Sequence, residues 1–223
     1  QKNMDQEAPL ASRLRPTTLE EVVGQQHIIG KDKLLYRAIK ADKLSSIIFY
    51  GPPGTGKTTL AKVIAHTTSA EFTQINATVA GKKDMEEVVQ KAKETLGMYQ
   101  KKTILFVDEI HRFNKGQQDY LLPFVEDGTI VLIGATTENP YFEVNGALLS
   151  RSVIFELKKL TKEDIQVLLQ RAVTDTEKGM GSYHAVIEPD AMEYLVPLIF
   201  SLLLSILTLS ITLETTVLSS VME

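Results

Sequence analysis

The chain has 223 residues, no cysteine and a formal net charge of −4. The lack of cysteine excludes disulfides and thiolate metal sites, which fits a reducing compartment. All Lys and Arg residues lie at or before Lys178, where they nearly balance the acidic residues. This nearly neutral part of the chain lacks the positive charge of a protein that binds DNA as a single copy. An oligomer could still bring its lysine clusters together around a channel.

The N-terminus up to Pro9 is polar and lacks the apolar stretch of a secretory signal, so residues 1–8 are expected to form a flexible tail.

The first clear motif lies between an expected strand and an expected helix. The apolar run Ile47 to Tyr50 predicts a buried strand, and residues 59–65 predict a helix. Between them, Gly51 to Thr58 reads Gly-Pro-Pro-Gly-Thr-Gly-Lys-Thr, a complete phosphate-binding loop.

This loop predicts binding of a nucleoside triphosphate. A strand that turns into a helix N-terminus aims unpaired backbone N–H groups and the helix dipole at one point. Lys57 can reach the β- and γ-phosphates, and the Thr58 hydroxyl can ligate Mg²⁺. The residues expected to contact the nucleotide here are Pro53, Gly54, Thr55, Gly56, Lys57, Thr58 and Thr59.

Further strands and helices alternate along the chain, which predicts a parallel sheet covered by helices. Strands are expected at residues 72–76, 103–107, 129–133 and 153–157. A helix is expected to start at Asp84, with Glu87 as its capping-box partner, and to end at Gly97. Residues 117–126 predict a short helix, which Pro123 must kink or interrupt.

The C-terminal part of the pattern is helical. Thr161 with Asp164 predicts a capped helix, which would begin a second unit.

The histidines at positions 27, 66, 111 and 184 have no metal-ligand spacing, so each is expected to be a surface or helix residue.

Two carboxylates follow the expected strand 103–107. Asp108 at the strand tip can hold the Mg²⁺ shell, and Glu109 can orient and deprotonate the attacking water. A carboxylate pair alone is more often solvated loop charge. The phosphate-binding loop lies earlier in the chain, one strand-helix-strand unit before the carboxylate pair, and this favours the catalytic interpretation.

Two later residues complete the expected site. A small polar side chain after the strand 129–133 would lie beside the γ-phosphate; Thr137 is the first choice and Asn139 the second. A turn rich in Thr and Asn before Pro140 remains the alternative. Arg151 precedes the last strand. A guanidinium supplied by a neighbouring subunit can neutralise charge on the transferring phosphoryl group, and Arg151 is the candidate for this role. The alternative is that it complements the helix dipole, as a lone Arg at a helix end usually does.

Taken in order, these motifs resemble the AAA+ ATPases of the clamp-loader and Holliday-junction-helicase branch. Residues 14–25 look like the N-terminal box of that branch, whose backbone and apolar side chains cover the adenine; this implies contacts from Val23 and Gly24. The segment Asp108 to Lys115, followed by Val125 to Thr129, is similar to the MgsA/RarA family, whose eukaryotic counterpart is the Werner-helicase-interacting protein.

The resemblance implies an α/β AAA+ P-loop NTPase with a parallel sheet flanked by helices, over residues 9–157, and a partial α-helical lid over residues 158–194. It implies a homo-oligomeric, DNA-stimulated ATPase that uses ATP and Mg²⁺ at stalled replication forks, in replication, repair and recombination. It also implies single-stranded DNA-binding protein and replisome components as partners, and a cytoplasmic, nucleoid-associated location without a membrane.

Residues 195–223 depart from that family. The resembled lid carries a second nucleotide-sensing Arg, whereas this segment has no basic residue. Residues 195–213 are uncharged and long enough to span a bilayer, but acidic flanks, five hydroxyl residues and Pro197 argue against it. Residues 207–213 alternate like a strand with one apolar face. The interpretation favoured here is an aberrant end.

Three functions therefore stay open for the chain. The leading one is ATP hydrolysis that remodels DNA, or protein on DNA, at replication forks. The second is a clamp-loader or Holliday-junction-helicase-like ATPase subunit. The third is a truncated nucleotide-binding fragment that does not turn over.

Overall fold

The computed structural model describes residues 9–202. They fall into two compact units, which are described separately. The larger comprises residues 16–158, and the described part of the smaller comprises residues 9–15 and 159–202. The expected flexible tail of residues 1–8 and the strand-like alternation of residues 207–213 lie outside the described residues.

A five-stranded parallel sheet forms the centre of the larger unit, in the order β2-β3-β4-β1-β5. The strands are β1 (Ser46–Tyr50), β2 (Glu71–Asn76), β3 (Thr103–Asp108), β4 (Ile130–Thr136) and β5 (Ser152–Glu156). The central strands β1, β3 and β4 are almost wholly buried, as expected for strands with helices on both faces. The predicted parallel α/β fold and its five strands are confirmed.

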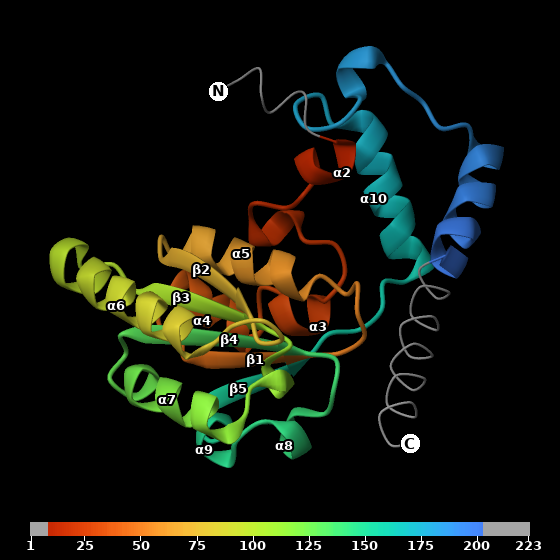
Figure 1. Ribbon diagram of the computed structural model, residues 1–223. Helices are drawn as coiled ribbons and strands as arrows, with labels where there is room; N and C mark the ends of the chain where they lie inside the picture. Colours follow the sequence, from red (N-terminus) through yellow and green to blue (C-terminus); the bar gives the residue numbers. More distant parts are fainter. Residues whose placement is uncertain (1–8, 203–223) are drawn as a thin grey trace, which may run out of the picture. The chain divides into compact units, whose positions relative to one another are not determined.

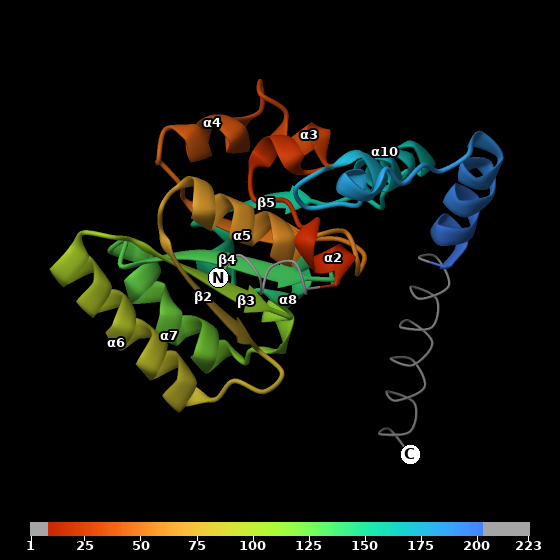
Figure 2. The same cartoon turned by 90° about the horizontal axis from the view of Figure 1, so that it is seen from above.

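Helices cover both faces of this sheet, because alternate strand residues point to opposite sides. Phe49, Phe106 and Ile133 face one core, which they share with η1 (Leu19–Glu21), α3 (Gln26–Ile29), α4 (Leu34–Lys40) and α5 (Lys57–Thr67). Ile48 and Leu105 face the other core, with α6 (Lys82–Tyr99), α7 (Lys115–Glu126) and α9 (Gly146–Leu149). Figure 2 shows α3, α4 and α5 grouped together, apart from α6 and α7, and Figure 1 labels the same helices in a second view.

Two helices differ from their predicted form. Helix α6 starts at Lys82, not at Asp84: the Asp84 carboxylate accepts a hydrogen bond from the Gly81 N–H at 2.7 Å, as a residue in the first turn can. Gly97 lies inside α6, and the helix ends after Tyr99, where Gln100 takes the left-handed conformation. Helix α7 continues through Pro123 to Glu126, so the proline does not interrupt it.

The smaller unit has its own apolar core. It contains α2 (Leu10–Arg13), α10 (Lys162–Thr174) and η3 (Gly181–Tyr183), and residues 189–202 are also helical. Thr161 and Asp164 form the predicted capping box of α10, with hydrogen bonds of 3.1 and 2.9 Å. Ile165, Met192 and Val196 form the core. Within residues 9–202, none of the helices is both long and apolar enough to cross a membrane.

Candidate nucleotide-binding and hydrolysis site

The order of the strands brings three predicted segments to one edge of the sheet. Strand β4 lies between β1 and β3. All strands are parallel, so the phosphate loop after β1, the carboxylates after β3 and the Thr-rich segment after β4 leave the sheet at the same edge. This carboxyl edge is where open parallel α/β sheets bind their ligands.

The phosphate loop begins at a position that only glycine fits. Gly51 has φ +144°, and a Cβ atom there would lie 2.2 Å from the Leu157 carbonyl oxygen. Gly54 and Gly56 also have positive φ, and Gly56 is the N-cap of α5. Because glycines have no Cβ atom, an anion can come close to the backbone N–H groups of the loop and of the first turn of α5.

Lys57 is held inside the loop. Its ammonium donates to the carbonyl oxygens of Gly51 at 2.7 Å and Pro52 at 2.8 Å. Burial lowers the pKa of Lys57 to about 8, and the charges of Glu109 and Asp108 oppose this shift. The two carboxylates at the end of β3 therefore oppose the effect of burial on Lys57, which begins α5.

Asp108 and Glu109 stand at the exit of β3. Asp108 is the last residue of the strand, and its Oδ1 accepts a hydrogen bond from the Glu109 N–H at 3.1 Å. Glu109 takes the left-handed conformation, with φ +55°, which turns the chain out of the strand into η2 (Ile110–Arg112). The Glu109 Oε2 lies 3.3 Å from Nε2 of His111.

At the end of β4, the hydroxyl of Thr136 contacts His111. Its Oγ1 lies 2.9 Å from Nδ1 of His111, and Thr137 is the first residue after the strand. Asn139 caps α8 (Pro140–Glu143) by accepting from the Tyr141 N–H at 3.1 Å, which favours a structural role for it. Sequence reasoning missed Thr136, since two adjacent threonines at a strand end give no signal to separate them.

His111 was expected to be a surface or helix residue, and it lies in the 3-10 helix η2. What the sequence did not predict is that only 9% of its side chain is exposed. The burial follows from its neighbours: Ile110 and Phe113 pack in the core beside it. A histidine at the exit of a carboxylate strand could have been considered a partner for Glu109.

Arg151 forms an ion pair with Glu126 at the end of α7. Its Nη1 also donates to the carbonyl oxygen of Ala147 at 3.0 Å and to Ser150 Oγ at 3.1 Å. Both partners of the ion pair are about two-fifths exposed, so the pair contributes only about 0–1 kcal/mol and can be exchanged for another anion.

Gln25 ties the N-terminal box to the phosphate loop, a role that sequence reasoning missed. Its Nε2 donates to the carbonyl oxygens of Lys158 at 2.7 Å and Thr55 at 3.3 Å, and its Oε1 accepts from the Lys158 N–H at 2.9 Å. Gln25 thus joins the N-terminal box, residues 14–25, to the phosphate loop and to the residue after Leu157. The sequence offered one signal for this role, which is the position of Gln25 inside this box.

The donor set fits a magnesium ion that arrives with a nucleotide. The protein offers the Thr58 hydroxyl and the Asp108 carboxylate, which are oxygen ligands, and Mg²⁺ completes such a shell with phosphates and water. Among residues 9–202 there is no cluster of three or more His, Cys, Asp or Glu side chains that would hold a metal unaided.

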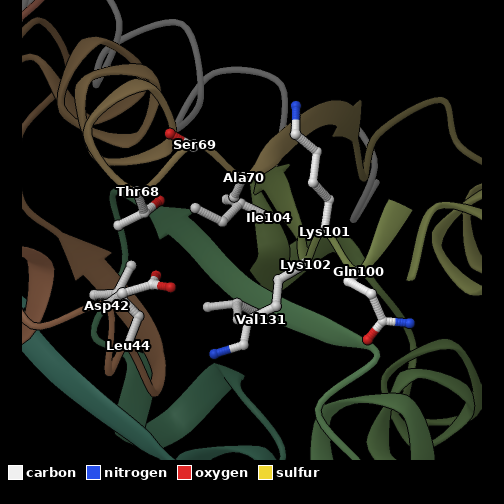
Figure 3. Close-up of a pocket in the computed structure, with 10 residues that line it drawn as sticks. All are labelled: Asp42, Leu44, Thr68, Ser69, Ala70, Gln100, Lys101, Lys102, Ile104 and Val131. Atoms are coloured by element: carbon white, nitrogen blue, oxygen red, sulfur yellow. The ribbon is translucent and has the colours of Figure 1, made fainter. Parts of the chain in front are cut away.

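A pocket of about 250 Å³ lies away from these residues. It is lined by the starts of β3 and β4, at Ile104 and Val131, and therefore lies at the amino edge of the sheet. Figure 3 shows Asp42 on one side of it and Gln100 on the other. It contains none of the predicted nucleotide residues.

A family model matches residues 47–159: "ATPase family associated with various cellular activities (AAA)". Replication-associated recombination protein A of Haemophilus influenzae is 51% identical over 187 residues, which are 84% of this chain and 42% of that protein. The protein of the same name from Bacillus subtilis is 50% identical over 186 residues, 83% of this chain and 43% of that protein. The chain thus spans about two-fifths of these bacterial relatives.

Two further comparisons extend the likeness. The ATPase WRNIP1 of Dictyostelium discoideum is 47% identical over 84% of this chain and 21% of its own length. A solved structure of a RuvB variant from Thermotoga maritima is 29% identical with a TM-score of 0.66, and the match covers 82% of this chain and 59% of that one.

Proposed function

The chain belongs to the AAA family of ATPases, and on this premise we propose that it binds ATP with Mg²⁺ and hydrolyses it at the carboxyl edge of its sheet. One observation carries the proposal. Strand β4 lies between β1 and β3, so the loop that holds Lys57 and the carboxylates of Asp108 and Glu109 leave the parallel sheet at the same edge. The charges of these carboxylates also oppose the effect of burial on the pKa of Lys57. This supports one site in which a cation, a metal ligand and a base act together.

The roles follow from the chemistry of each group. The backbone N–H groups of the loop and Lys57 bind the phosphates, and Lys57 exchanges its bonds to the Gly51 and Pro52 carbonyl oxygens for phosphate oxygens. Thr58 and Asp108 would hold Mg²⁺, which would supply positive charge to neutralise the β- and γ-phosphates. Glu109 accepts a proton from the water that attacks the γ-phosphorus, while the bond to the bridging oxygen of ADP breaks. Thr137 lies beside the γ-phosphate.

The other predicted contacts complete the pocket. Val23 and Gly24 cover the adenine, and Pro53, Gly54, Thr55, Gly56 and Thr59 line the phosphates. Arg151 acts on the nucleotide of a neighbouring copy. Its exposed position and its exchangeable pairing with Glu126 support this role.

The biological setting of the proposal comes from the relatives. We propose that hydrolysis is coupled to remodelling of DNA, or of protein on DNA, at replication forks, with single-stranded DNA-binding protein and replisome components as partners. The similarity to replication-associated recombination protein A supports this. A branch-migration motor is the second candidate, favoured by the likeness to RuvB of Thermotoga maritima, a Holliday junction branch migration motor.

The test is ATP turnover with and without single-stranded DNA, alongside mass by light scattering. The proposal predicts Mg²⁺-dependent turnover that rises when single-stranded DNA is added. Stimulation by four-way junctions and not by single strands would favour the second candidate. Turnover that Lys57→Ala leaves intact would contradict the assigned site, and nucleotide binding without turnover would identify an inert fragment.

A further inference from the structure

We propose that His111 is a positioning residue for hydrolysis, which holds the Glu109 carboxylate and couples it to the end of β4 through Thr136. This inference rests on the proposed function, in which Glu109 is the base. It assigns a task to a buried side chain that the proposed reaction does not otherwise use. The imidazole joins two separate segments of the carboxyl edge, because its two nitrogens contact residues from the exits of β3 and β4.

The first support is that the backbone fixes the ring in place. The Arg112 N–H donates to the Glu109 carbonyl oxygen at 2.8 Å, which closes the η2 turn around the histidine. The preceding residue, Ile110, is fully buried and packs tightly on β4: a Cβ atom on Gly134 would lie 2.8 Å from its Cδ1. His111 is therefore anchored on the strand that carries Thr136.

The second support is the direction of the hydrogen bonds. The Glu138 N–H donates to Thr136 Oγ1 at 3.0 Å, so this hydroxyl oxygen already accepts one bond. Its proton can go to His111 Nδ1 at 2.9 Å, which is a shorter contact than the 3.5 Å to the Glu138 carbonyl oxygen. Nδ1 then accepts, and Nε2 carries the proton that it donates to Glu109 Oε2.

One chain of bonds thus runs from the Glu138 backbone through Thr136 and His111 to Glu109. A carboxylate whose Oε2 is held can keep Oε1 directed at the attacking water, and such orientation is worth up to about a hundredfold in rate. Because β4 lies between β1 and β3, a displacement of its end when nucleotide binds would reach the base through this chain. A histidine that only fills the core would need no donor towards Glu109.

Two substitutions separate these roles. His111→Asn keeps a polar group near Thr136 but is too short to reach Glu109. His111→Gln can still present an amide N–H to the carboxylate. We expect His111→Asn to lower kcat about 10- to 100-fold with KM and nucleotide affinity within about twofold, and His111→Gln to restore most of the loss. His66→Asn, an exposed change on α5, is the matched control with unchanged turnover.

Thr136 provides a second pair of variants if the His111 variants fold poorly. Thr136→Val removes the hydroxyl at almost constant volume, and Thr136→Ser retains it. The proposal predicts a lowered kcat for Thr136→Val that Thr136→Ser restores, with thermal melting measured for each.

A third comparison distinguishes failure of this inference from failure of the proposed function. If His111 acts through Glu109, adding His111→Asn to Glu109→Gln lowers turnover no further. Full turnover in His111→Asn, while Glu109→Gln is inactive, would overturn the role of His111 alone. Full turnover in Glu109→Gln would overturn the proposed base. Equal losses of kcat in the Asn and Gln variants, together with lowered melting temperatures, would show that His111 is only structural.

Discussion

At the scale of single residues, the burial of Lys57 has a consequence for nucleotide binding. Burial lowers its pKa to about 8 in the nucleotide-free protein. Phosphates stabilise the ammonium form, so bound nucleotide raises this pKa. Below pH 8 the side chain is charged in both states. Above pH 8 binding must take up a proton, so we predict that nucleotide affinity falls as the pH rises.

The check is isothermal titration calorimetry at about pH 9 in two buffers of different ionisation enthalpy. Wild-type protein should take up most of one proton per nucleotide bound. Lys57→Arg is the matched control, because a guanidinium stays protonated and should bind without proton uptake. Equal uptake by both proteins would place the titrating group elsewhere.

The predictability of the site also differs residue by residue. The loop Gly51 to Thr58 and the pair Asp108-Glu109 could be proposed as site residues from the sequence because each is a local pattern with a distinctive chemistry. The contacts of His111 and Gln25 were not, since each joins segments far apart in the chain. The Gln25 side chain reaches Lys158, 133 residues away, through hydrogen bonds to its backbone.

At the scale of elements, the turn from β1 into the phosphate loop depends on one glycine. A Cβ atom on Gly51 would lie 2.2 Å from the Leu157 backbone oxygen, whereas one on Gly54 meets nothing within 4 Å. Both residues have positive φ, so alanine at either position costs about 1–2 kcal/mol of backbone strain. Gly51→Ala must also displace β5 or its exit.

We therefore predict that Gly51→Ala lowers the free energy of unfolding by more than about 3 kcal/mol, and Gly54→Ala by about 1–2 kcal/mol. Urea denaturation without nucleotide measures both values and leaves out any effect on phosphate binding. Similar losses for the two variants would mean that the loop relaxes around a side chain at position 51.

Elements were predicted well where burial determines the pattern and less well at their ends. The apolar runs of β1, β3 and β4 gave the strands because all three are covered on both faces. The start of α6 was misjudged because an Asp can accept N–H groups either as the N-cap or, as Asp84 does, from within the first turn. Pro123 lies inside α7 although a proline there removes a helical hydrogen bond, and the same helix buries Leu121 in the core.

At the scale of the whole molecule, the proposed role of Arg151 would make activity a property of two copies. Its partner in this structure is Glu126, and a γ-phosphate of a neighbouring copy can replace that carboxylate. If Arg151 acts in this way, turnover per chain should rise with protein concentration. Arg151→Ala and Lys57→Ala should each be inactive alone.

We predict that mixing the two inactive variants restores part of the turnover. An Arg151→Ala chain supplies an intact nucleotide site, and a Lys57→Ala chain supplies the arginine, whose contribution is about 10³–10⁵ in rate for such residues. The measurement is ATP hydrolysis across mixing ratios, with hetero-assembly verified by mass. Assembly of mixed oligomers without any recovery would show that Arg151 serves its own chain or only the fold.

The central claim is that binding and hydrolysis are separate tasks of the carboxyl edge, with Glu109 needed only for the second. Glu109→Gln keeps the shape and hydrogen bonding of the side chain but removes the base. The most direct measurement is single-turnover hydrolysis by this variant beside its affinity for a fluorescent ATP analogue, with Lys57→Ala as the comparison. We predict near wild-type affinity and at least about a hundredfold slower hydrolysis for Glu109→Gln, and loss of binding for Lys57→Ala. Hydrolysis by Glu109→Gln at the wild-type rate would contradict the account.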